Sequence, residues 1–102
     1  ELSDTDKARV YTNIAFNHDY TAEALGYLLK AKDLDSPFVE TYTGLGLYYF
    51  SMYQSNENKE GLILSQKYFE KAKNIDDSYD YSFNHAVSLY ELKEYEKAKE
   101  IF

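Results

Sequence analysis

Few residues of this chain combine the type and the spacing that catalysis or metal binding requires. The two histidines, His18 and His85, are far apart in the sequence and no HExxH motif is present, so packing or surface placement explains both better than metal ligation. The carboxylates of 33–35 and 76–77 lie at the ends of predicted helices. Water solvates such turns, so nothing there would raise a carboxyl pKa for acid–base catalysis.

Other catalytic and ligand-binding motifs are also missing. The segment 56–61 imitates the first half of a calcium loop, but the twelfth position, which must be acidic, is Lys67. The four glycines are scattered and form no phosphate-binding loop, and no serine has the flanking residues of a hydrolase nucleophile. We therefore expect no enzyme activity and no bound metal or cofactor.

The charge balance narrows the class of partner. The 102-residue chain has 18 acidic and 11 basic residues, a net charge of −7, so we expect no nucleic-acid binding. The longest stretch without charge, 41–56, is too short and too polar to span a bilayer. The sequence has no cysteine and no signal-like run, so it does not indicate in which cellular compartment the protein acts.

The hydrophobic pattern predicts an all-α protein. Apolar residues recur at every third or fourth position along the chain, and Gly and Pro are few. Ser3 or Asp4 is expected to cap the first helix, Thr21 the second, and Pro37 to begin the third. The expected helices are about 4–16, 21–34, 37–53, 62–75, 79–92 and 94–102, with a polar loop at 54–61.

Three segments of this pattern repeat. In each, a small residue precedes a large apolar one by four positions, as in the pairs Ala24/Leu28, Ser65/Phe69 and Ala98/Phe102. Each segment follows a helix with a small residue at the matching place, and these residues are Thr12, Gly46 and Ala86. Small residues let paired helices approach closely, while large ones fill the space between neighbouring pairs.

The middle copy resembles the tetratricopeptide repeat, whose W-x2-L-G-x2-Y signature appears here as Tyr42, Leu45, Gly46 and Tyr49, with its A-x3-F part at 65–69. The resemblance implies a right-handed superhelical array of antiparallel helix pairs, an α-solenoid. Residues 1–102 would form one domain with repeats at about 5–36, 38–77 and 79–102. The 54–61 loop and the weak signature of the first helix depart from the family pattern. An unrelated helical bundle is the alternative.

The resemblance also implies a function, because first helices of such repeats line a concave groove that holds a peptide or a partner helix. We therefore expect a protein-interaction module whose partner segment has apolar anchors and neutral or basic character. The predicted groove residues are Arg9, Asn13, Phe16, Asn17, Thr43, Leu47, Phe50, Phe83, Asn84 and Val87. For Phe50 and Phe83, simple packing between repeats is an equal alternative.

Some members of the family hold the C-terminal carboxylate of chaperones that end in EEVD, using a clamp of Lys, Asn, Asn, Lys and Arg. The matching positions here are Arg9, Asn13, Gly44, Asp80 and Asn84. Asp80 would repel a carboxylate, so we expect this chain not to bind EEVD tails.

The pattern stops at Ile101-Phe102 within an apolar run. We expect a fragment of a longer protein, which could self-associate through this end. Two other functions stay open: a structural spacer within a longer array, and an accessory domain of an enzyme whose catalytic part lies elsewhere.

Overall fold

The computed structural model describes residues 2–18, 21–56 and 59–76, and this part of the chain is all-α. Its helices are α1 (Asp4–Phe16), α2 (Ala22–Asp33), α3 (Val39–Asn56) and α4 (Lys59–Ile75). The predicted helices at 79–92 and 94–102, and with them the third repeat, lie outside the described residues.

The first two helices begin where the sequence predicts, because side chains cap them. Ser3 accepts a hydrogen bond from the backbone N–H of Asp6 at 3.1 Å, and the Asp6 carboxylate accepts one from the Ser3 N–H at 3.4 Å. Thr21 accepts from the N–H of Ala24 at 3.2 Å. The turn after α2 includes Asp35, whose φ of 51° lies in the left-handed region.

The predicted loop at 54–61 is wrong in most of its length. Residues 54–56 continue α3, and residues 59–61 form the first turn of α4. Gly61, at the end of the predicted polar loop, has a packing role, because a Cβ there would lie 2.8 Å from the backbone oxygen of Tyr49. Gly61 therefore lets the start of α4 approach the backbone of α3.

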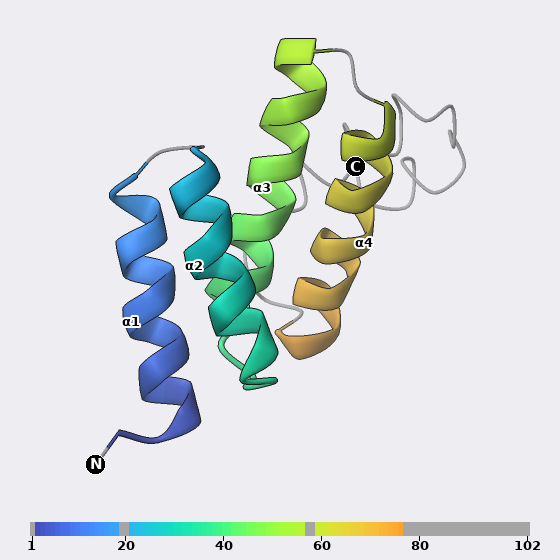
Figure 1. The fold of residues 1–102 in the computed structure, drawn as a ribbon. Coiled ribbons are helices and arrows are strands. Elements are labelled where there is room, and N and C mark those ends of the chain that lie inside the picture. The colour runs from blue at the N-terminus through green and yellow to red at the C-terminus, as the bar shows by residue number, and fades with distance from the viewer. Residues whose placement is uncertain (1, 19–20, 57–58, 77–102) are drawn as a thin grey trace.

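The helices form two antiparallel pairs that lie side by side (Figure 1). α1 packs mainly on α2 and α3 mainly on α4, while α3 also contacts both α1 and α2. The core lies between these layers and includes Leu28, Tyr42, Leu45 and Phe69. Tyr42 and Phe69 are buried in this core, whereas Tyr49 is only partly buried.

A close contact in the second pair joins Gly46 of α3 to Phe69 of α4. A Cβ on Gly46 would lie 2.6 Å from Cε1 of the Phe69 ring, which is fully buried. Ser65, also fully buried, donates its hydroxyl to the carbonyl oxygen of Leu62 at 2.7 Å. Gly46 therefore lies at a close approach of α3 to α4, and Ser65 is fully buried in the same pair.

A buried hydrogen bond connects the two pairs. The hydroxyls of Thr12 on α1 and Thr41 on α3 are 2.8 Å apart, and the residues are 0% and 1% exposed. Thr12 was expected only as a small packing residue. Its hydroxyl gives the pairs a directional contact in addition to apolar burial.

Candidate functional site

The α1 residues predicted for the groove share one face, at spacings of four and seven. Phe16 is 49% exposed, and Asn13 is also exposed. Arg9 is already engaged: its Nη1 lies 3.3 Å from Oδ1 of Asp6, and its guanidinium is 5.4 Å from the ring centroid of Phe38. Phe16 is therefore the main apolar side chain that this face presents.

Asn17 has a structural role at the end of α1. It is the C-cap residue, and its backbone N–H donates to the carbonyl oxygens of Asn13 and Ile14. Asn17 directly follows Phe16, and its side chain is exposed.

On α3, the predicted residues differ in what they expose. Thr43 is 8% exposed and donates its hydroxyl to the carbonyl oxygen of Val39 at 3.3 Å. Phe50 is also 8% exposed, and its ring centroid is 6.2 Å from that of Tyr53. These two side chains offer little surface to a partner, whereas Leu47 is half-buried.

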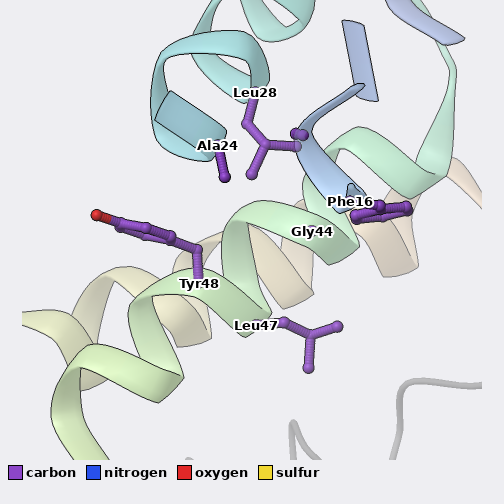
Figure 2. Close-up of a pocket in the computed structure, with 7 residues that line it drawn as sticks. Phe16, Ala24, Leu28, Gly44, Leu47 and Tyr48 are labelled. Carbon is purple, nitrogen blue, oxygen red and sulfur yellow. The ribbon is translucent and has the colours of Figure 1, made fainter. Parts of the chain in front are cut away.

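A pocket brings Phe16 and Leu47 together where α1, α2 and α3 meet. It has a volume of about 180 Å³, and its lining is Ala15, Phe16, Ala24, Leu28, Gly44, Leu47 and Tyr48. In Figure 2, Ala24 and Leu28 project from α2 toward α3, and Phe16 lies beside Gly44. Apart from the Tyr48 hydroxyl, the lining side chains are apolar.

Gly44 is the residue that allows this arrangement. A Cβ there would lie 2.9 Å from Cε1 of Phe16 and 3.0 Å from Cδ2 of Leu28. Without a side chain at this position, the Phe16 ring can rest against α3. The family resemblance matched Gly44 to a position of the carboxylate clamp, but nothing in the sequence indicated that Tyr48 or Ala15 would line the same pocket.

The remaining candidates do not extend this site within the described residues. Phe83, Asn84 and Val87 lie outside them, as do Asp80 and His85. His18 stacks on Tyr27 with ring centroids 6.0 Å apart, and its Nδ1 is 3.6 Å from Oε2 of Glu23. This agrees with a packing role for His18.

The described residues contain no cluster of three or more acidic or histidine side chains that could hold a metal ion. Burial raises the pKa of Tyr42, and the nearby Asp35 carboxylate raises it further. Burial likewise raises the pKa of Tyr49, with a smaller contribution from Tyr68. Both tyrosines therefore stay neutral at physiological pH.

In the described segments, no helix has the length and apolar character needed to cross a bilayer. Comparison of the chain with family models, curated proteins and solved structures returned no match.

Proposed function

We propose that this chain is a non-catalytic protein-interaction module, built as a tetratricopeptide-like solenoid, that binds a partner segment along α1 and α3. The observation that carries the proposal is the apolar pocket of about 180 Å³, with Phe16 half-exposed at its side. An engineered apolar cavity of about 150 Å³ holds a benzene ring. The pocket is therefore large enough to receive one apolar side chain of a partner.

The helix pairing supports the solenoid part of the proposal. The repeat motif predicts close approach at Gly46 and Ser65. Both residues are buried, and Gly46 of α3 lies against the Phe69 ring of α4. The second pair also packs beside the first through α3. A repeat array requires this kind of stacking between successive pairs.

The site and the overall charge suggest the character of the partner. Asn13 of α1 and the C-cap residue Asn17 flank Phe16 and are exposed. An amide side chain can both donate to and accept from an extended peptide backbone. The net charge of −7 favours a neutral or basic segment. The proposed ligand is therefore a peptide with one apolar anchor and basic flanks.

A peptide-display selection tests the proposal. Peptides selected on the wild-type chain should bind at least about tenfold more weakly to Phe16→Ala/Leu47→Ala, since hot-spot anchors lose 1.4 kcal/mol or more on truncation. The matched control is Val10→Ala/Ile63→Ala, which trims exposed apolar side chains outside the pocket (46% and 51% exposed). Circular dichroism should show that all three proteins are equally folded.

Two results would contradict the proposal. Selected peptides that bind the pocket variant as well as the wild type would place their site elsewhere. A selection that yields no peptide would instead favour a spacer segment of a longer array or an accessory domain of an enzyme.

A further inference from the structure

A second, polar cleft lies on a different part of the molecule from the apolar pocket. Its lining comes from the end of α2 and the turn after it, from the first half of α3 and from the second half of α4. Its volume is about 420 Å³. Its lining is Lys32, Asp33, Asp35, Tyr42, Lys67, Tyr68 and Lys71.

Two of the lysines lie over buried tyrosine rings. Nζ of Lys32 is 5.9 Å from the ring centroid of Tyr68, and Nζ of Lys71 is 5.5 Å from that of Tyr42. Tyr42 is 3% exposed and Tyr68 is 9% exposed. A cation–π contact positions an ammonium group without neutralising it, so both groups keep N–H donors for another ligand.

Within the described residues, no salt bridge joins a lysine of the cleft to a carboxylate. Along the described residues, the salt bridges join Arg9 to Asp6 and His18 to Glu23 and involve none of the cleft lysines. Lys67 and Lys71 are four positions apart on α4, a spacing at which like charges repel. The fold therefore concentrates three ammonium groups in one cleft of a chain that is acidic overall.

We propose that this cleft, the lysine cleft, binds an oxyanion, either a phosphate group or a carboxylate group. Three ammonium groups face two carboxylates there, which leaves one net positive charge. The hydroxyls of Tyr42 and Tyr68 add neutral donors. The inference is independent of the apolar pocket and of the peptide proposed for it.

The two aspartates determine how an oxyanion can approach. Asp33 and Asp35 belong to the end of α2 and its following turn, whereas Lys67 and Lys71 are on α4. An anion is repelled on the α2 side and attracted on the α4 side. It should therefore contact Lys67 and Lys71 first, with Lys32 completing the site.

An NMR titration of the 102-residue chain tests the proposal. Inorganic phosphate and the peptide acetyl-Glu-Glu-amide are added as separate probes at low ionic strength. At least one probe should give saturable amide shifts centred on residues 32, 67 and 71. Lys67→Gln/Lys71→Gln should weaken this binding roughly tenfold. Asp35→Asn should strengthen it, because it removes a repelling charge.

Lys7→Gln/Lys59→Gln is the matched control, since it removes two exposed lysines outside the cleft and should leave binding unchanged. Tighter binding of phosphate would identify a phosphate group as the ligand, and tighter binding of the peptide would identify carboxylates. Equal affinity of the wild type and the cleft variant would overturn the proposal. So would dissociation constants above about 10 mM for both probes.

Discussion

Replacement of Gly46 by alanine tests how closely α3 and α4 pack. The added Cβ would lie 2.6, 2.7 and 2.9 Å from three atoms of the Phe69 ring. Because Phe69 is 0% exposed, its ring cannot swing into solvent to make room. Overpacking of this kind costs about 3 kcal/mol at the upper end of its usual range.

Helix propensity acts in the opposite direction. Alanine is favoured over glycine inside a helix by about 1 kcal/mol, so Gly46→Ala should destabilise the fold by about 2 kcal/mol. In a domain of this size, such a loss lowers the melting temperature by roughly 8–16 °C. Urea unfolding followed by circular dichroism measures the change in free energy directly.

Gly26→Ala is the matched control, because a Cβ on Gly26 would meet no heavy atom within 4 Å. This change on α2 should stabilise the protein by about 1 kcal/mol. Adding Phe69→Leu to Gly46→Ala should recover part of the loss, since it removes ring atoms that clash. If Gly46→Ala were as stable as the wild type, the proposed close packing of α3 on α4 would be refuted.

Three other changes test separate features by urea unfolding. Thr12→Val should lower the free energy of unfolding by about 1–3 kcal/mol, because it leaves the buried Thr41 hydroxyl without its partner. Thr12→Val/Thr41→Val should be nearly neutral, because it removes both hydroxyls. Equal effects of the single and double variants would contradict this account. Asp35→Gly should raise the free energy of unfolding by about 1 kcal/mol, because glycine adopts the left-handed backbone at φ 51° without strain. A loss of stability would show that the contacts of the aspartate side chain outweigh the strain of its backbone. Burial raises the folded-state pKa of Tyr42 and Tyr49 above the ordinary value of 10.0. Both tyrosines therefore contribute fully to the free energy of unfolding below about pH 10, and this contribution is lost as the pH rises through the raised pKa values. Tyr42→Phe/Tyr49→Phe should therefore show a smaller loss of stability between about pH 9 and 12 than the wild type, and an identical pH profile would count against the shifts.

The sequence was sufficient to predict the four described helices, apart from their ends near 54–61, and the burial of the repeated small and large residues. Apolar periodicity and local caps depend on neighbouring residues, so Ser3 and Thr21 marked helix starts correctly. The recurring small and large pair similarly predicted the buried positions of Ser65 and Phe69. The resemblance to a repeat family and the groove derived from it stay predictions.

The sequence was less informative where a residue's role depends on a distant helix. The polar residues of 54–61 suggested a loop, but Gly61 lets the start of α4 lie against the backbone of α3. Thr43 and Phe50 shared a face with Leu47, yet the fold buries both. Periodicity identifies the residues on one face but does not say how deeply a neighbouring helix covers them.

Local order along the chain therefore determined which segments become helices and which residues make close contacts within a helix pair. The register between pairs determined the sites. The Thr12–Thr41 bond joins residues 29 positions apart, and the apolar pocket and the lysine cleft each draw side chains from three helices. Such sites depend on how packed helices are rotated and shifted relative to one another. Many weak contacts together determine this geometry, so it cannot be predicted from a short sequence pattern.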